Sequence, residues 1–115
     1  MKPLVWMNGS LQSYEEMGIS PFDHGVTVGN GVFETMISFT GHPFAFTRHY
    51  ERLQRSASVM GLSLRPREEL LEASLAVLDA NKLGKRRARL RITITGGPAP
   101  LGSERGNAGE TALVA

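Results

Sequence analysis

The sequence contains no cysteine among its 115 residues. This absence excludes disulfide bonds, thiolate chemistry and zinc sites built on thiolates. Long apolar runs are missing too, since no stretch approaches the roughly 18 residues that indicate a membrane-spanning helix. Residues 1–10 lack the order of charged, apolar and small residues that marks a signal peptide. We therefore expect a cytoplasmic protein that does not enter a membrane.

Charge of one sign is also scarce, because 13 basic and 11 acidic residues leave a net charge of only +2. The 41% hydrophobic and 21% charged content is ordinary for a soluble globular protein. At this length we expect one domain with a single core. Basic residues cluster at Arg48, Arg52 and Arg55 and again over residues 85–91, so an anionic partner is permitted but not required.

Local patterns in the first half of the chain predict two hairpins. Asn8-Gly9 separates two short apolar stretches, and this dipeptide is favoured in two-residue turns because both positions need a positive φ. Alternation over residues 32–39 predicts a strand. Gly41-His42-Pro43 then reverses the chain into FAF, residues 44–46, as the second strand of another hairpin.

Two helices and two further strands follow. Thr47 is the expected N-cap of a helix that ends at Gly61, and Pro66 is expected to open a second helix that closes over residues 81–84. Alternation over residues 89–94 predicts a half-buried strand, residues 96–109 a loop, and residues 110–115 another strand. The apolar positions expected to face the core are Leu53, Ala57 and Met60 in the first helix and Leu70, Leu71, Leu75 and Leu78 in the second. The fold class is thus α+β, with a mainly antiparallel sheet covered by two helices in two layers.

Three candidate sites carry little weight. His24, His42 and His49 have no second ligand at metal-binding spacing on a shared helix, so we expect no metal. The segment GPAPLGS, residues 97–103, imitates the spacing of a phosphate-binding loop but lacks the lysine and the following helix. The arginines of residues 87–91 have no interleaved aromatics for base stacking, so we expect no nucleic-acid binding.

The first predicted helix is more informative. Arg48, Arg52 and Arg55 recur at i, i+4 and i+7, which places three cations on one stripe beside the apolar one. Such a stripe is compatible with simple solvation. A planar guanidinium near a glycine-rich loop is also how proteins hold a phosphate through paired hydrogen bonds. The residues alone leave both interpretations open.

The glycine-rich stretch DHGVTVGNGVFETM, residues 23–36, indicates a shaped loop that runs into a strand. Together with three other segments it resembles a known family. VWMNG, DHGVTVGNGVFET, HYERLQRSA and RLRITITGG occur in the order and spacing of the N-terminal domain of class IV (fold-type IV) pyridoxal-phosphate aminotransferases. The resemblance covers essentially the whole chain. FDHGVTVGNGVFET and TGGPAPLGSERG most resemble the members that are 4-amino-4-deoxychorismate lyases.

The resemblance implies a cofactor and site residues. The cofactor would be pyridoxal 5'-phosphate, and Arg52, the arginine of the family's RL motif, would bind its phosphate. The glycine-rich loop and the following strand would line the substrate pocket with Gly31, Phe33 and Glu34. For Phe33, a place in the hydrophobic core is the competing interpretation.

The resemblance also implies what this chain lacks. The family's catalytic lysine, which bonds the cofactor as a Schiff base, belongs to a second domain, and Lys2, Lys82 and Lys85 match no catalytic motif. We expect residues 1–115 to be the small N-terminal domain of an enzyme whose catalytic C-terminal domain is absent here, and to be inactive alone. No residue of this chain is expected to be catalytic. The complete enzyme would be a homodimer.

The substrates implied are an amino acid with a 2-oxo acid, for amino-group transfer, or aminodeoxychorismate, for pyruvate elimination. D-amino-acid aminotransferases carry an arginine and a histidine where this sequence has Leu101 and Ser103, which argues against that activity. Branched-chain transfer and lyase activity stay open. The alternative function is a noncatalytic basic module that binds an anionic partner or RNA.

Overall fold

The computed structural model describes residues 3–100 and 109–115. The strands are β1 (Leu4–Met7), β2 (Ser10–Ser13), β3 (Gly31–Phe39), β4 (His42–Pro43), β5 (Ala88–Thr95) and β6 (Thr111–Val114). The helices are α1 (His24–Thr27), α2 (Phe46–Val59) and α3 (Arg67–Ala80). None of the helices in these described ranges is long and apolar enough to cross a membrane.

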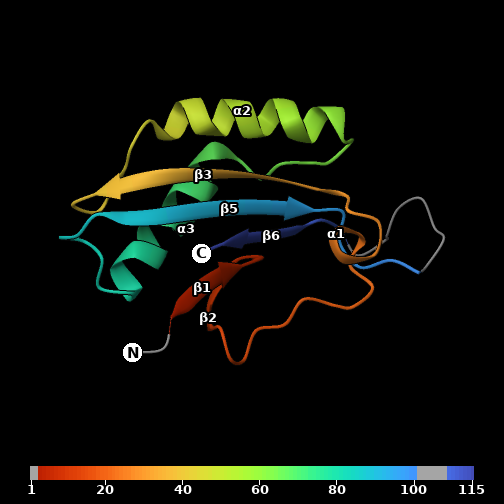
Figure 1. The fold of residues 1–115 in the computed structure, drawn as a ribbon, viewed down its shortest axis with the longest axis horizontal. Coiled ribbons are helices and arrows are strands. Elements are labelled where there is room, and N and C mark those ends of the chain that lie inside the picture. The colour runs from red at the N-terminus through yellow and green to blue at the C-terminus, as the bar shows by residue number, and fades with distance from the viewer. Residues whose placement is uncertain (1–2, 101–108) are drawn as a thin grey trace.

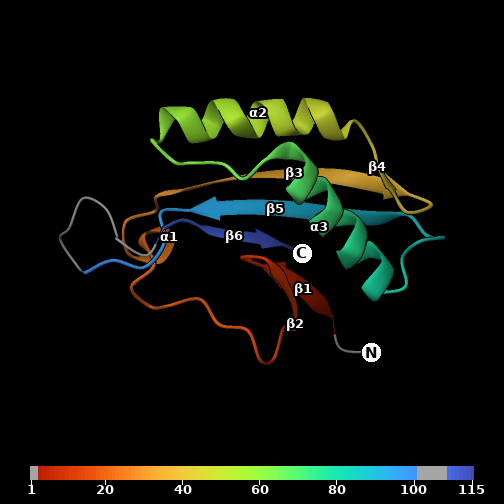
Figure 2. The same cartoon turned by 180° about the vertical axis from the view of Figure 1, so that it is seen from behind.

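The strands form one antiparallel sheet in the order β2-β1-β6-β5-β3-β4. Figures 1 and 2 show it from opposite sides: α3 crosses behind the sheet in Figure 1 and in front of it in Figure 2, while α2 runs alongside β3 in both. The expected α+β architecture, with two helices packed on a mainly antiparallel sheet, is confirmed. The strand expected near the end of the chain is also present, and as β6 it occupies a central place between β1 and β5.

The first predicted hairpin is present, and the second is shorter than predicted. Asn8 and Gly9 form the turn between β1 and β2 with φ values of 48° and 108°, as the dipeptide requires. After β3, however, only residues 42–43 pair back as β4. Ala45 adopts a left-handed conformation with φ of 55°, and α2 begins at the next residue. The expected FAF strand therefore becomes the start of a helix, and β3 pairs along its length with β5 instead.

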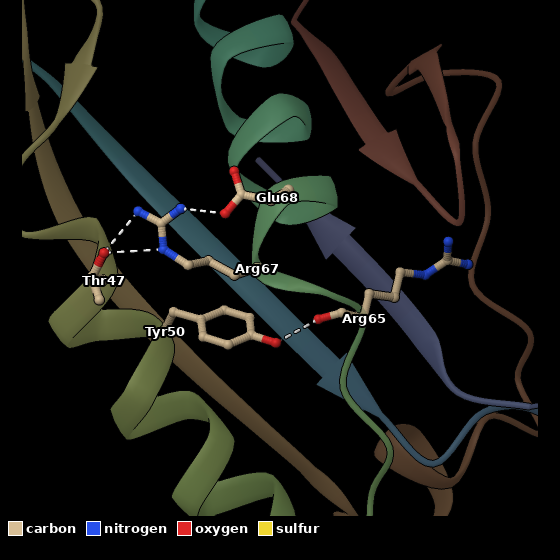
Figure 3. Close-up of polar contacts among 5 residues, drawn as sticks. All are labelled: Thr47, Tyr50, Arg65, Arg67 and Glu68. Atoms are coloured by element: carbon tan, nitrogen blue, oxygen red, sulfur yellow. Dashed lines mark hydrogen bonds and ion pairs between the residues drawn. The ribbon is translucent and has the colours of Figure 1, made fainter.

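Thr47 is not the helix cap that the sequence suggested, because α2 already begins at Phe46. Its hydroxyl oxygen instead accepts hydrogen bonds from Arg67 at the start of α3, with Nε at 3.0 Å and Nη2 at 2.7 Å (Figure 3). Nearby, the Tyr50 hydroxyl donates to the backbone oxygen of Arg65 at 2.8 Å. Burial raises the pKa of Tyr50 above its ordinary value, so this hydroxyl stays protonated as a donor. These bonds tie α2 to the segment that leads into α3.

The core lies between the sheet and the two long helices. From the strands it takes Met36, Leu90, Ile92, Ile94 and Val114, and from the helices Leu53, Ala57, Leu70, Ala73, Val77 and Leu78. Two predicted core positions are wrong, since Met60 is 41% and Leu75 39% exposed. Met60 lies beyond the last residue of α2, and the buried side of α3 is centred on Leu70, Ser74 and Val77, one helical step away from Leu75.

The predicted loop over residues 96–109 lies partly outside the described residues, and Leu101 and Ser103 fall in that undescribed part. The described beginning of the loop meets the glycine-rich stretch. Pro98 forms an isolated antiparallel bridge with Asp23, and the N–H of His24 donates to the carbonyl oxygen of Gly97 at 2.9 Å. Two segments far apart in the sequence are thus joined at one end of the sheet.

Asp23 anchors the glycine-rich stretch and is fully buried. Its Oδ1 atom accepts a hydrogen bond from the N–H of Gly25 at 2.7 Å, which caps the short helix α1. Its Oδ2 atom accepts one from the Thr111 hydroxyl in β6 at 2.8 Å. A buried carboxylate is costly unless it is hydrogen-bonded, and here both oxygens have a donor. Asp23 therefore connects the loop to the central part of the sheet.

We expect the Asp23→Ala substitution to lower the free energy of unfolding by about 1.5–3 kcal/mol, because it removes two charge-assisted bonds and leaves the Thr111 hydroxyl without its acceptor. Urea denaturation of the protein measures the change. Asp79→Ala, at an exposed position of α3, is the control and should change the free energy by less than about 0.5 kcal/mol. Equal effects of the two substitutions would show that Asp23 has no anchoring role.

Candidate functional site

Phe33 and Glu34, predicted to line one pocket together, project from opposite faces of the sheet. Glu34 is buried beneath α2, whereas the Phe33 side is open and this residue is 53% exposed. The Arg91 guanidinium stacks on the Phe33 ring, with its carbon 3.8 Å from the ring centroid. Phe33 is therefore not a core aromatic. It is an exposed ring with a cation on its face, and such a ring can form the wall of a binding surface.

Gly31 lies where the backbones of β3 and β5 are packed closely. A Cβ atom at this position would lie 3.3 Å from the backbone oxygen of Ile94, which is tighter than an ordinary contact. Two residues earlier, Gly29 has φ of 68°, a conformation that favours glycine. The glycines of this loop thus serve the chain's own geometry at these two positions. The structure gives Gly31 a reason to be glycine that is independent of a substrate.

The Glu34 carboxylate holds two side chains of α2. Its Oε1 atom lies 2.7 Å from His49 Nδ1, and its Oε2 atom lies 3.7 Å from Arg52 Nε. The side chain of Glu34 is only 10% exposed, against 62% for Arg52. His49 and Arg52 are three residues apart, so one turn of helix presents both to the carboxylate. This Glu34–His49–Arg52 cluster joins the strand after the glycine-rich loop to the arginine stripe.

A depression of about 500 Å³ opens on the outer side of α2. It is lined by Ala45, Arg48, His49, Glu51, Arg52 and Arg55. All three arginines of the predicted stripe therefore border the same depression. Within the described part of the chain, Arg48 and Arg55 form no ion pair, so Arg52 is the member of the stripe that a buried carboxylate holds.

The residues around this depression fit the phosphate of pyridoxal phosphate. A phosphate group presents several acceptor oxygens and close to two negative charges at neutral pH, and guanidinium groups are its preferred partners. Arg52 binds Glu34 through Nε, and its terminal nitrogens form no hydrogen bond with any residue in ranges 3–100 and 109–115. Those terminal nitrogens remain available to an anion, and Arg48 and Arg55 add positive charge on the same side.

The basic residues near β5 have aromatic partners that the sequence did not reveal. Arg91 stacks on Phe33, and the guanidinium carbon of Arg87 lies 5.9 Å from the centroid of the Phe39 ring. Both rings come from β3, the neighbouring strand. Cation–π contacts thus account for two of the arginines to which the sequence assigned no role. Among the described residues, no three His, Asp or Glu side chains gather closely enough to hold a metal ion.

His49 is the member of the cluster that sequence reasoning missed. The sequence suggests it only as a metal ligand, and its partner Glu34 lies 15 residues earlier, on a strand. Only the alternation of β3, which turns Glu34 toward the helices, could have suggested the pairing. That alternation did not show which face of the strand is buried.

Comparison with known proteins places this geometry in context. Residues 31–115 match the family described as amino-transferase class IV. The chain is 34% identical to the aminodeoxychorismate lyase of Bacillus subtilis (strain 168), over 82% of this chain and 32% of that protein. It is 38% identical to a D-alanine aminotransferase of Staphylococcus aureus (strain N315), over 69% of this chain and 28% of that protein.

A solved structure supports the same assignment. A branched-chain amino acid aminotransferase from T.th., in complex with N-(5'-phosphopyridoxyl)-L-glutamate, superposes with a TM-score of 0.84 at 29% identity. The match covers 99% of this chain and 40% of that one. The chain thus spans about a third of the length of the curated relatives it matches. From the matched family, the relatives and the shared fold, we conclude that this chain belongs to the class IV aminotransferase family.

Proposed function

We propose that residues 1–115 form the N-terminal domain of a pyridoxal-phosphate-dependent enzyme, and that Arg52 binds the cofactor phosphate there. One observation carries the proposal for Arg52. Of the three arginines at the depression on α2, Arg52 alone is held by a buried carboxylate in the described part of the chain, and its terminal nitrogens are open to an anion. The related structure with a bound phosphopyridoxyl compound supports the choice of cofactor.

When bound, the cofactor would supply an electron sink that stabilises a carbanion at the α-carbon of the substrate. The residues of this chain would bind and orient rather than move protons. Arg52 would hold the phosphate, and Phe33 would form an aromatic wall on the open face of the sheet. Lys82 and Lys85 follow the end of α3, outside the Glu34–His49–Arg52 cluster and the depression. We therefore propose that residues 1–115 alone are inactive, and that the catalytic lysine belongs to a further domain.

The reaction of the complete protein is proposed as either amino-group transfer to a 2-oxo acid or pyruvate elimination from aminodeoxychorismate. The relatives support both, because one is named a lyase and the others aminotransferases. The D-alanine aminotransferase at 38% identity also shows that Leu101 and Ser103 are too weak a reason to set D-amino acids aside. All these relatives are named as enzymes, which favours catalysis over a noncatalytic module for an anionic partner or RNA.

We further propose that the complete protein is a cytoplasmic homodimer, as the family resemblance implies. An apolar surface suited to such contact lies around α1. Phe22 is 51%, Val26 65% and Val28 68% exposed there. Clustered exposed apolar side chains of this kind are typical of protein–protein contacts.

A titration of pyridoxal phosphate into the complete protein tests the enzyme proposal against the binding-module alternative. We expect a saturable absorption band from cofactor bound to the lysine of the second domain. Residues 1–115 alone should show no such band. A folded complete protein that gives no band would contradict the proposed function.

The Arg52→Ala substitution in the complete protein should weaken cofactor affinity by about one to two orders of magnitude. Charge-assisted hydrogen bonds contribute roughly 1.5–3 kcal/mol, and each tenfold change in affinity corresponds to about 1.4 kcal/mol. Arg52→Lys should restore affinity only partly, because lysine provides a point charge without the planar fork. The dissociation constant of pyridoxal phosphate, measured by absorbance, checks both expectations.

Arg55→Ala is the matched control, since it removes the same charge from the same stripe at a position with no ion pair among the described residues. It should change the cofactor dissociation constant by less than about threefold. Folding of each variant is checked first, because α2 also carries Leu53 and Ala57 into the core. The opposite result, with affinity lost in Arg55→Ala and kept in Arg52→Ala, would place the phosphate one helical turn away.

Assays of the complete protein on two substrate sets would separate the two reactions. If the protein is a lyase, aminodeoxychorismate alone should release pyruvate, and leucine with 2-oxoglutarate should give little glutamate. An aminotransferase should show the reverse preference, and D-alanine with 2-oxoglutarate extends the test to D-amino acids. Inactivity on all three sets, in protein that binds the cofactor, would contradict the proposed reaction classes.

A further inference from the structure

Glu34 is the one carboxylate of β3, and its place under α2 is energetically unfavourable without partners. It is 8% exposed, among the side chains that pack between the sheet and the helix. Burying a charged carboxylate costs free energy unless it is paired and hydrogen-bonded. Both partners come from one helical turn of α2, and one of them is the arginine proposed to bind phosphate. The cluster therefore connects the buried interior to the candidate binding surface.

The two carboxylate oxygens have different partners. Oε1 is held by His49 at 2.7 Å, and because an ionised carboxylate only accepts, His49 Nδ1 is the donor. Oε2 is left to Arg52, which approaches through Nε at 3.7 Å. This arrangement uses the inner nitrogen of the guanidinium and leaves the two terminal nitrogens for a second acceptor. A bidentate phosphate contact needs those terminal nitrogens in one plane.

We propose that Glu34, itself fixed by His49, is a positioning residue that orients the Arg52 guanidinium toward the cofactor phosphate. The inference rests on the proposed function, and it gives Glu34 a different role from the substrate-pocket role that the sequence suggested. It also explains why Arg52, rather than Arg48 or Arg55, is suited to bind the anion. All three border the depression, but among the described residues Arg52 alone has a buried anchor.

Two opposing effects of Glu34 on phosphate binding must be weighed. Its negative charge repels an anion, and its hold on Arg52 reduces the rotamer freedom that a long side chain loses on binding. The charge is already shared between two donors, and Glu34 contacts Nε rather than the terminal nitrogens. We therefore infer that ordering outweighs repulsion, so that removing the charge weakens phosphate binding.

The test compares two ligands of the complete protein, pyridoxal phosphate and pyridoxal, which differ only in the phosphate. Their dissociation constants are measured by absorbance on the same preparation, so that a loss of folded protein cancels in their ratio. Glu34→Gln keeps the size of the side chain and removes its charge. We expect it to weaken pyridoxal phosphate binding by about threefold to tenfold and to change pyridoxal binding by less than about twofold. His49→Ala should shift the ratio in the same direction.

Glu51→Gln is the charge-matched control, because Glu51 borders the same depression but forms no ion pair with Arg52. It should change the ratio by less than about twofold. A double-mutant cycle adds a second criterion. If Glu34 acts through Arg52, the Glu34→Gln/Arg52→Ala protein should match Arg52→Ala alone within about twofold.

The outcomes separate the inference from the proposed function. If Arg52→Ala lowers the preference for pyridoxal phosphate while Glu34→Gln leaves it unchanged or raises it, the positioning role is wrong and the phosphate site stands. Independent, additive losses in the double variant would also overturn the positioning role. If Arg52→Ala leaves the preference unchanged, the phosphate assignment is wrong, and the inference fails with it.

Discussion

The antiparallel register between β3 and β5 decides which side chains of the candidate site can meet. Pairing runs from Gly31 opposite Thr95 to Ser38 opposite Ala88. Because side chains alternate along a strand, this one register sends Glu34 toward the helices and Phe33 to the open face. A shift by one residue would exchange the two, burying a phenylalanine and exposing the carboxylate. The cluster under α2 and the Phe33–Arg91 stack therefore both depend on the same set of backbone hydrogen bonds.

Packing of α2 then determines what the buried carboxylate can reach. Leu53 and Ala57 are almost fully buried against the sheet, and they fix the rotation of the helix about its axis. With that rotation set, His49 and Arg52 lie at the margin between core and solvent. There one side chain can contact Glu34 and still face outward. The apolar contacts that stabilise the domain thus also orient its polar site, and the free-energy cost of the buried charge is offset by its two partners.

Much of the fold could be predicted from the sequence, because its signals are local. The Asn8-Gly9 turn, the alternation of β5 and the glycine at position 61 each reflect the backbone preferences of a few neighbouring residues. Predictions were wrong where a distant contact prevailed. Thr47 resembles a helix cap by its type, but Ala45 turns the chain into α2 earlier and Arg67 occupies the Thr47 hydroxyl. Leu75 fits a helical apolar spacing, yet Ser74 faces the core and satisfies its hydroxyl on the backbone of Leu70.

For the site, the sequence by itself determined the residue types, the stripe of three arginines on one helix and the family whose motifs they match. It did not determine that Arg52 would be the anchored member, since Arg48 and Arg55 share its stripe and its charge. Nor could it pair Glu34 with His49, because one lies on a strand and the other on a helix, 15 residues apart. Helical periodicity acts over a few residues and can be read along the chain. The partner of a buried charge is decided only when sheet register and helix packing bring distant segments within hydrogen-bonding distance, and that is a property of the tertiary structure.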